Sequence, residues 1–460
     1  MSRLVLASNR VADLSGGVTA GGLSVAVVDA LRDGNGVWFG WSGEIVDDQA
    51  KVGLSLERYE TVTIATQPMT QDEYDRYYLG YSNRALWPVF HNRLDLAVFD
   101  AEALEGYKAV NRRMAKSLAG LLTDDDVVWI HDYQLIPLGA QLRALGIKNR
   151  IGFFLHIPFP PHEILSAVPD HRWLIDTLFA YDVVGFQTPN DVANFGRYSE
   201  ETAHEVNAQD CPFRHAQRSL IAKAYPIGID VDQFHAMANT PEAAERIRRL
   251  KRGSIDQHII GVDRLDYSKG LPDRLRSYQR FLESFPGHRK NTVLMQIAPP
   301  TREELSAYSD IRIELEQLSG AINGQFGDFD WTPVRYIHRS ISRDTLAALF
   351  KGSKVGLVTP LRDGMNLVAK EYIAAQEADD PGVLILSQFA GAAADLEEAM
   401  IVNPYDPGEV AVAMNAALSM SLEERCDRHN ALLARIKQRD AAHWRHSFLA
   451  DLDGAARSAS

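Results

Sequence analysis

The sequence predicts an α/β protein built from two doubly wound, Rossmann-like domains. Short apolar runs without polar alternation, the pattern of strands buried on both faces of a parallel sheet, recur along the whole chain. Amphipathic stretches of helical period separate these runs. The chain has 460 residues, whereas a single core stops growing near ~250–300 residues, so two domains are expected.

Strands and helices alternate in a regular order. The strands are expected at residues 3–8, 126–130, 151–156, 182–186, 258–262, 292–298, 354–359 and 382–386. The helices are expected at residues 133–145, 189–206, 270–285, 303–319, 342–352 and 366–378. This alternation predicts parallel sheets with helices on both faces.

The alternation stops between about residues 231 and 256, where the chain is polar, helical and without a strand. A strand–helix series restarts at His258, and the last stretch is helical with no strand to cover. We therefore predict a first domain over 1–235, a second over 236–435, and a C-terminal helix over 436–460 that packs back on the first domain. Two such domains in tandem are expected to hold a ligand in a deep cleft between the carboxyl ends of their sheets.

Composition excludes several classes of function. The 48 Lys and Arg residues against 61 Asp and Glu give a net charge of −13, which disfavours a nucleic acid or a membrane surface as partner. Cys211 and Cys426 form no C-x-x-C pair, so neither a disulfide framework nor a zinc ribbon is indicated. The apolar run before Ser8 is too short for a signal peptide, and no stretch approaches the ~20 apolar residues of a membrane span. We expect a cytoplasmic protein.

A glycine and the start of a helix follow strand 354–359. Gly364 allows the backbone to approach a ligand closely, and a helix N-terminus is a common binding site for a diphosphate. Glu371, further along the helix, could accept hydrogen bonds from a ribose. A routine turn with an acid on the surface has the same pattern, and the spacing leaves both interpretations open.

Two cations follow strand 258–262. Arg264 and Lys269 could both neutralise the charge that grows on a leaving nucleotide diphosphate, which would make a bound metal unnecessary. An exposed arginine and lysine in a solvated loop is the alternative.

Three strands of the first domain end in polar residues: Arg10, the pair His131–Asp132, and His156. A single histidine at a strand end is usually structural, but three such ends in one domain indicate a site. Aromatic residues beside glycines, among them Trp41, Tyr78 and Trp87, could pack on sugar faces, with core packing as the alternative.

Other catalytic patterns are absent from the sequence. The glycine-rich loop before Leu23 is not G-x-G-x-x-G, and there is no P-loop, H-E-x-x-H or G-x-S-x-G motif. The acidic run 124–126 could suggest a metal site, but it precedes a strand, and we predict a solvated turn there.

When longer strings of residues are compared, the chain resembles the trehalose-6-phosphate synthases, which are retaining glycosyltransferases of the two-domain GT-B type. The resemblance runs from Ser2 to about Phe448. Its strings, in chain order, are SNR (8–10), GGL (21–23), WFGWSGE (38–44), SNRALWPVFH (82–91), WIHDYQL (129–135), GFFLHIPFP (152–160), RLDYSKGLP (264–272), LVTPLRDGMNLVAKEY (357–372), LSQFAGAA (386–393) and IVNPYD (401–406).

The resemblance implies transfer of glucose from a nucleotide-glucose, UDP-glucose before GDP- or ADP-glucose, to glucose 6-phosphate with retention. The implied acceptor-binding residues are Arg10, Trp41, Tyr78, Trp87, Asp132 and Arg302. The implied donor-binding residues are Gly21, Gly22, His156, Arg264, Lys269, Ile341, Asp363, Gly364, Met365, Asn366, Leu367, Val368 and Glu371. The residues implied in catalysis are Asp132, His156, Arg264, Lys269 and Asp363. UDP-glucose is then a substrate, and neither a cofactor nor a metal is expected.

Three other functions fit the same fold: a transferase acting on a cyclitol phosphate, a glycogen-type elongating transferase, and a non-catalytic sugar-phosphate sensor. The intact set of acceptor-phosphate residues argues against a polymer acceptor. A sensor would usually have lost Arg264, Lys269 or Glu371, and all three are present. We also expect a homo-oligomer, either a dimer or a tetramer.

Overall fold

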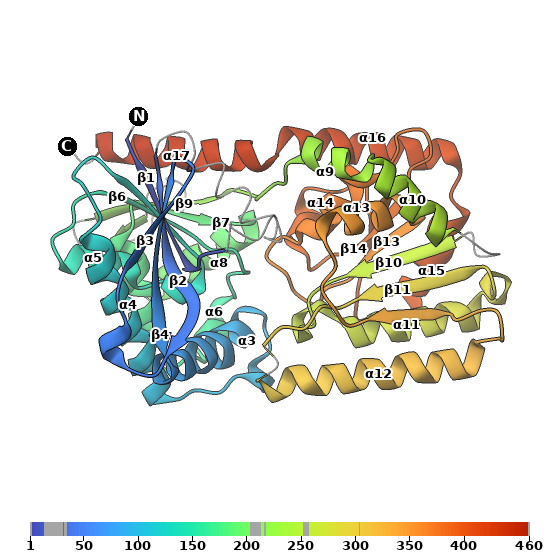
Figure 1. Cartoon of the computed structure of the whole chain (residues 1–460), viewed down its shortest axis with the longest axis horizontal. Coiled ribbons are helices and arrows are strands. Elements are labelled where there is room, and N and C mark those ends of the chain that lie inside the picture. Colours follow the sequence, from blue (N-terminus) through green and yellow to red (C-terminus); the bar gives the residue numbers. More distant parts are fainter. Residues whose placement is uncertain are drawn as a thin grey trace. The chain divides into compact units, whose positions relative to one another are not determined.

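Two units make up the chain in the computed structural model, which describes residues 2–12, 31, 35–202, 213–215, 218–251, 257–302 and 304–458 (Figure 1). The first unit comprises Met1–Pro226 and Ala442–Ser460, and the second comprises Ile227–Ala441. The first boundary therefore lies before the predicted position at residue 235, and the second lies after residue 435.

Contacts of the segment after Pro226 explain the earlier boundary. Lys370 Nζ donates a hydrogen bond to Ile227 O at 2.8 Å, and the His235 ring lies 3.2 Å from Ala374 O. Both partners belong to the second unit, so the residues that follow Pro226 pack there as α9 (Val231–Ala238).

The C-terminal helix α17 (Ala441–Ser458) is the part of the first unit that is most distant in sequence. The ring centroids of Trp444 and Phe448 lie 4.9 and 4.7 Å from that of Trp129, in the middle of the sheet. All three side chains are at most 1% exposed, so this helix supplies part of the core.

The sheet of the first unit has the strand order β3-β4-β2-β1-β5-β6-β7-β9-β8. Neighbouring strands are parallel, except that β3 runs antiparallel to β4 and β8 to β9. The strands are β1 (Leu4–Arg10), β2 (Val37–Val46), β3 (Ser55–Tyr59), β4 (Val62–Thr70), β5 (Val127–His131), β6 (Arg150–Phe154), β7 (Val183–Phe186), β8 (Phe213–His215) and β9 (Arg218–Ala224). From β4 to β7 this is the doubly wound order, whose switch point lies between β1 and β5.

Helices cover this sheet and connect its strands (Figure 1). They are α2 (Gln71–Glu73), the π-helix η2 (Tyr74–Leu86), α3 (Trp87–Phe90), α4 (Ala101–Ala119), α5 (Leu138–Ala144), α6 (His162–Leu165), α7 (His171–Asp176) and α8 (Pro189–Glu201), with 3-10 turns η1 (Gln49–Lys51), η3 (Leu94–Leu96), η4 (Tyr133–Leu135) and η5 (Thr177–Ala180).

The second unit is a parallel sheet of order β12-β11-β10-β13-β14-β15, the Rossmann order with its switch point between β10 and β13. The strands are β10 (Gln257–Val262), β11 (Thr292–Ile297), β12 (Val334–Ile337), β13 (Val355–Val358), β14 (Val383–Ser387) and β15 (Met400–Val402). The helices are α9, α10 (Pro241–Leu250), α11 (Leu271–Ser284), α12 (Ser306–Phe326), α13 (Arg343–Gly352), α14 (Leu367–Ala375), α15 (Pro407–Ser419) and α16 (Leu422–Gln438), with 3-10 turns η6 (Tyr267–Lys269), η7 (Pro286–His288) and η8 (Gly391–Ala394).

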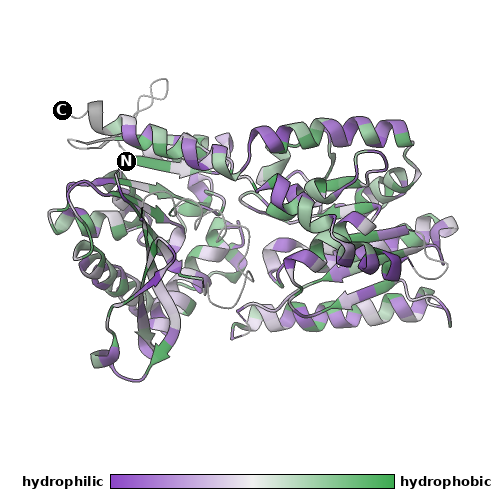
Figure 2. Ribbon diagram, turned by 45° about the horizontal axis from the view of Figure 1, so that its top comes forward, coloured by the Kyte–Doolittle hydropathy of each residue, from purple (hydrophilic) through white to green (hydrophobic). Residues whose placement is uncertain are grey.

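The α/β fold class is confirmed, and each predicted strand overlaps a strand of the structure. Hydrophilic and hydrophobic residues alternate along α12 and α16, as expected of helices with one buried face (Figure 2). The predicted solvated turn at 124–126 is wrong for Asp126, which is 2% exposed and accepts hydrogen bonds from Arg3 Nε at 2.9 Å and Nη2 at 2.6 Å. The Asp126 carboxylate therefore connects the start of β1 to the start of β5, which is a structural role.

Candidate active site

Polar side chains follow both strands at the switch point of the first unit. Arg10 is exposed at the end of β1, and its guanidinium carbon lies 5.6 Å from the ring centroid of Trp41. Gly43 has a φ of 90°, and a Cβ at this position would lie 2.7 Å from Arg10 Nη2. The glycine therefore leaves room for the guanidinium group beside the backbone of β2.

An aromatic cluster surrounds Trp41. Its ring centroid lies 5.6 Å from that of Tyr74 and 5.8 Å from that of Tyr78, and the two tyrosines stack at 5.3 Å. Both tyrosines belong to the π-helix η2, a rare conformation that often occurs at functional sites. The structure thus brings the predicted residues Trp41 and Tyr78 together and adds Tyr74, which the sequence analysis did not single out.

The two tryptophans predicted to frame the acceptor sugar are mostly buried. Trp41 is 5% exposed, and its indole N–H donates to Glu44 O at 2.9 Å. Trp87 is 4% exposed and packs against His91 and Tyr133, with centroid distances of 4.2 and 5.6 Å. Packing is therefore their main role in this structure, and their contact with a sugar stays a prediction.

Asp132 has an unusual backbone conformation directly after β5. Its φ of 77° and ψ of 164° lie in a region that only glycine occupies readily, at a cost of about 1–3 kcal/mol. Its N–H donates to Phe154 O at 2.8 Å, and its Oδ1 accepts from His156 N at 3.2 Å. These contacts orient the carboxylate and join the ends of β5 and β6, where the sequence predicted two separate polar residues.

His156 is paired with the histidine that precedes Asp132. His131 Nδ1 lies 2.9 Å from His156 Nε2, and the rings stack with centroids 5.2 Å apart. Trp444 of the C-terminal helix lies 6.1 Å from each ring. Burial lowers the pKa of His156 to about 3 and that of His131 well below its ordinary value, an effect to which His156 adds. His156 can therefore offer a neutral ring nitrogen to a ligand.

We expect the His156 ring to stay neutral from about pH 8 down to about pH 5, and the His131 ring to stay neutral well below its ordinary pKa, because burial opposes their charged forms. The unfolded chain binds these protons near pH 6.5, so the first unit should lose stability as the pH falls below about 6.5. NMR titration of the two imidazole rings measures this directly. A midpoint above about pH 5 for His156, or one near the ordinary histidine value for His131, would contradict the burial described.

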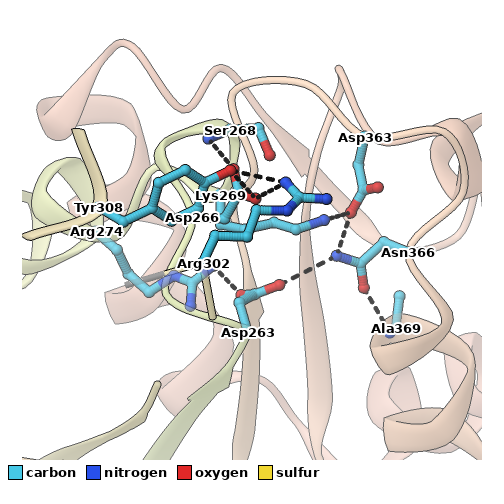
Figure 3. A network of polar contacts seen from close by, with 10 residues as sticks. All are labelled: Asp263, Asp266, Ser268, Lys269, Arg274, Arg302, Tyr308, Asp363, Asn366 and Ala369. Atoms are coloured by element: carbon cyan, nitrogen blue, oxygen red, sulfur yellow. Dashed lines mark hydrogen bonds and ion pairs between the residues drawn. The ribbon is translucent and has the colours of Figure 1, made fainter. Parts of the chain in front are cut away.

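The switch point of the second unit joins a cation to a carboxylate (Figure 3). Lys269 lies in η6 just after β10, and its Nζ lies 2.5 Å from Asp363 Oδ2 in the loop after β13. Their side chains are 10% and 14% exposed. The structure thus brings together two residues that the sequence placed after different strands.

A buried network orients Asp363. The Arg274 side chain is fully buried and donates to Asp263 Oδ2 at 2.7 Å and to Thr359 Oγ1 at 2.9 Å. Asn366 Nδ2 donates to Asp363 Oδ2 at 3.0 Å and lies 3.4 Å from Asp263 Oδ1 (Figure 3). Sequence reasoning missed Arg274 and Asp263, because a charged pair this deeply buried is recognised only from the fold.

Helix α14 begins beside this network. Asn366, with a φ of 78°, caps the helix by accepting a hydrogen bond from Ala369 N at 3.3 Å. The first N–H groups of a helix lack partners within the helix and favour an anion. The backbone predicted to bind the donor lies in this loop and first turn, at Gly364, Met365, Asn366, Leu367 and Val368.

Glu371 lies one turn further along α14. Its Oε1 is 3.5 Å from Arg343 Nη2 at the start of α13, and both side chains are mostly buried. Burial raises the pKa of Glu371, and the Arg343 charge opposes this shift. Ile341, whose backbone was predicted to bind the base, lies two residues before Arg343 and is half-buried. The sequence predicted Glu371 and Ile341, but not Arg343.

The remaining predicted cations differ in exposure. Arg264 is exposed just after β10, whereas the Arg302 side chain is 6% exposed and its residue has a φ of 49°. Arg302 Nη1 donates to Tyr308 OH at 2.7 Å and lies 3.4 Å from Asp266 Oδ2. Gly21 and Gly22 lie outside the described residues. Within the described ranges, no group of three or more His, Cys, Asp or Glu residues could hold a metal ion.

Comparison with known proteins relates this arrangement to one enzyme family. The sequence pattern that defines Glycosyltransferase family 20 matches residues 11–454 of this chain. The trehalose-6-phosphate synthase of Sodalis glossinidius (strain morsitans) is 47% identical over 453 residues, covering 98% of this chain and 96% of the relative.

Two solved structures are similarly close. An α,α-trehalose-phosphate synthase (UDP-forming) from Burkholderia xenovorans, in complex with glucose-6-phosphate, is 46% identical with a TM-score of 0.94, covering 98% of this chain and 100% of that one. A protein from E. coli bound with UDP-2-fluoro glucose is 46% identical with a TM-score of 0.92, covering 98% and 99%. The chain therefore belongs to glycosyltransferase family 20.

Proposed function

We propose that this chain transfers glucose from UDP-glucose to glucose 6-phosphate with retention, forming α,α-trehalose 6-phosphate. The observation that carries the proposal is the pairing of Lys269 with Asp363 at the switch point where α14 begins. A cation beside a helix N-terminus suits a diphosphate, and a carboxylate beside it suits sugar hydroxyls. The relatives solved with glucose-6-phosphate and with UDP-2-fluoro glucose support this choice of substrates.

In the donor site, Arg264, Lys269 and the first turn of α14 bind the diphosphate. Glu371 accepts hydrogen bonds from the ribose, and its mostly buried carboxylate beside Arg343 is suited to a fixed partner. The Ile341 backbone binds the base. His156 and Asp363 bind the donor glucose, and the backbone of Gly21 and Gly22 also binds the donor.

In the acceptor site, Arg10, Tyr78 and Arg302 bind the phosphate. The Asp132 carboxylate and the edges of Trp41 and Trp87 contact the sugar. Asp132 is held by the His156 backbone, so it can orient a hydroxyl without rearranging. This role fits Asp132 better than that of a covalent nucleophile.

The reaction proceeds by attack on the face from which the nucleotide leaves. The bond between the anomeric carbon of the donor and the diphosphate oxygen breaks, and a bond to the anomeric hydroxyl of the acceptor forms. The leaving diphosphate takes the proton of that hydroxyl. Lys269, Arg264 and the α14 N-terminus stabilise the negative charge that develops on the diphosphate.

The test is incubation with glucose 6-phosphate and UDP-, GDP- or ADP-glucose, with measurement of nucleotide diphosphate release and of the disaccharide product. UDP release with formation of trehalose 6-phosphate is the expected result. Binding without turnover would indicate a sensor instead, and release with a cyclitol phosphate alone would indicate a different transferase.

Activity should persist in excess EDTA, apart from a modest ionic effect, because protein cations carry the diphosphate charge. Initial rates with and without chelator, and after addition of Mg²⁺ or Mn²⁺, measure this. Complete loss that a divalent ion restores would mean that a metal stabilises the leaving group.

Two properties expected from the sequence stay predictions: a homo-oligomer and a cytoplasmic location. No helix in the described part of the chain is long and apolar enough to cross a membrane. Light scattering on the purified protein would determine the oligomeric state.

A further inference from the structure

Asp266 has no role in the proposed reaction, but its carboxylate contacts groups next to two candidate cations, Lys269 and Arg302. Asp266 lies between β10 and η6 and is fully buried. Its Oδ1 accepts a hydrogen bond from Ser268 N at 3.0 Å. Its Oδ2 accepts from Tyr308 OH at 3.2 Å and lies 3.4 Å from Arg302 Nη1 (Figure 3).

The first oxygen acts on the donor side. By accepting from Ser268 N, Oδ1 caps η6, the short turn that ends at Lys269. The Asp266 carbonyl also accepts from Lys269 N at 3.0 Å. This turn sets the position from which the Lys269 side chain reaches Asp363, so the cap helps to place the ammonium group.

The second oxygen acts on the acceptor side. The Arg302 side chain is 6% exposed, and a buried guanidinium group needs a nearby negative charge. Asp266 supplies that charge directly, and Tyr308, which is 1% exposed, connects the two by accepting from Arg302 at 2.7 Å and donating to Asp266. At 3.4 Å, the direct contact is longer than an ordinary charge-assisted hydrogen bond, so a phosphate dianion can compete with it.

We propose that Asp266 is a positioning residue that places both cations, Lys269 for the donor diphosphate through Oδ1 and Arg302 for the acceptor phosphate through Oδ2. The proposal rests on the function proposed above. Its consequence is that the two substrate sites share one buried carboxylate. The two oxygens have separable roles, because the first needs only a hydrogen-bond acceptor and the second needs a charge.

Asp266→Asn separates these roles. The amide oxygen still accepts from Ser268 N, but the negative charge facing Arg302 is removed. We expect the KM for glucose 6-phosphate to rise by roughly tenfold or more, the scale of one weakened charged contact, while the KM for UDP-glucose changes far less. The preference for glucose 6-phosphate over glucose in kcat/KM should fall by a similar factor.

Two further variants complete the design. Tyr308→Phe removes a hydroxyl on the acceptor side and leaves the η6 cap intact, so it should raise the KM for glucose 6-phosphate selectively. Asp266→Ala removes both functions and should raise both KM values and lower kcat. Thermal melts of all three variants identify any variant that does not fold.

Equal effects of Asp266→Asn on both KM values, or an unchanged preference between the two acceptors, would overturn the proposal. Calorimetric titration of UDP and of glucose 6-phosphate into each variant makes the test independent of turnover. If the wild type binds both ligands without turnover, the proposed function fails and the titrations still decide the role of Asp266. If the wild type binds neither, both proposals fail.

Discussion

Glucose is expected to be a poorer acceptor than glucose 6-phosphate by roughly 10³-fold or more in kcat/KM, since each lost charged contact costs about 2 kcal/mol. In the proposed site, the phosphate dianion accepts hydrogen bonds from the Arg10 and Arg302 guanidinium groups and the Tyr78 hydroxyl. Arg10 is exposed beside the Trp41 ring, and Arg302 donates a hydrogen bond to the Tyr308 hydroxyl. Each arginine side chain therefore has a neighbour that helps to position it. Glucose offers none of these charged contacts.

The measurement compares initial rates with both acceptors at saturating UDP-glucose. Arg302→Ala should weaken the use of glucose 6-phosphate while nearly preserving UDP binding, and Arg10→Ala is its matched variant in the first unit. Each variant should lose far more activity with glucose 6-phosphate than with glucose. Comparable wild-type rates with the two acceptors would contradict both the phosphate-binding residues and the proposed product.

The central strands could be predicted because burial on both faces leaves a continuous apolar run, as in β5, β10 and β14. The strands that were missed lack this pattern. Along β4 (VTIATQPMT), buried and partly exposed residues alternate, and β15 is only three residues long. In β2, glycines, a serine and a glutamate interrupt the aromatic residues, and sequence reasoning took these for a ligand site alone.

The candidate site, too, contains residues that could be predicted from the sequence and residues that could not. Lys269, just after a strand, could be predicted because a switch point collects strand ends, whereas Asp363 was expected only from the resemblance. The residues that hold Lys269 and Asp363 in place could not be predicted. Arg274 and Asp266 are fully buried charges in or beside a helix, and only the packing shows which partner compensates each. The π-helix that stacks Tyr74 on Tyr78 likewise has no distinctive pattern in the sequence.

Loss of either leaving-group cation, in Arg264→Ala or Lys269→Ala, is expected to lower kcat by on the order of 10²-fold, the usual scale for one charge-stabilising contact. The structure predicts a difference between the two variants. Arg264 is exposed, and its removal takes one positive charge away from the leaving-group site. Lys269 lies 2.5 Å from Asp363, so its removal also takes a positive charge away from that carboxylate, next to the site of a dianionic leaving group.

Lys269→Ala should therefore lower kcat more than Arg264→Ala does, and part of its effect should come from the negative charge of Asp363 that Lys269 no longer balances. A double-mutant cycle separates the two contributions. If the uncompensated carboxylate repels the diphosphate, Asp363→Asn in the Lys269→Ala background should cost less kcat than Asp363→Asn alone. Single-turnover rates at saturating substrates measure the chemical step. Additive losses would show that the ion pair has no part in catalysis. An unchanged kcat in both single variants would remove both cations from the proposed mechanism, because the chemical step slows when the charge on the leaving diphosphate is less well stabilised.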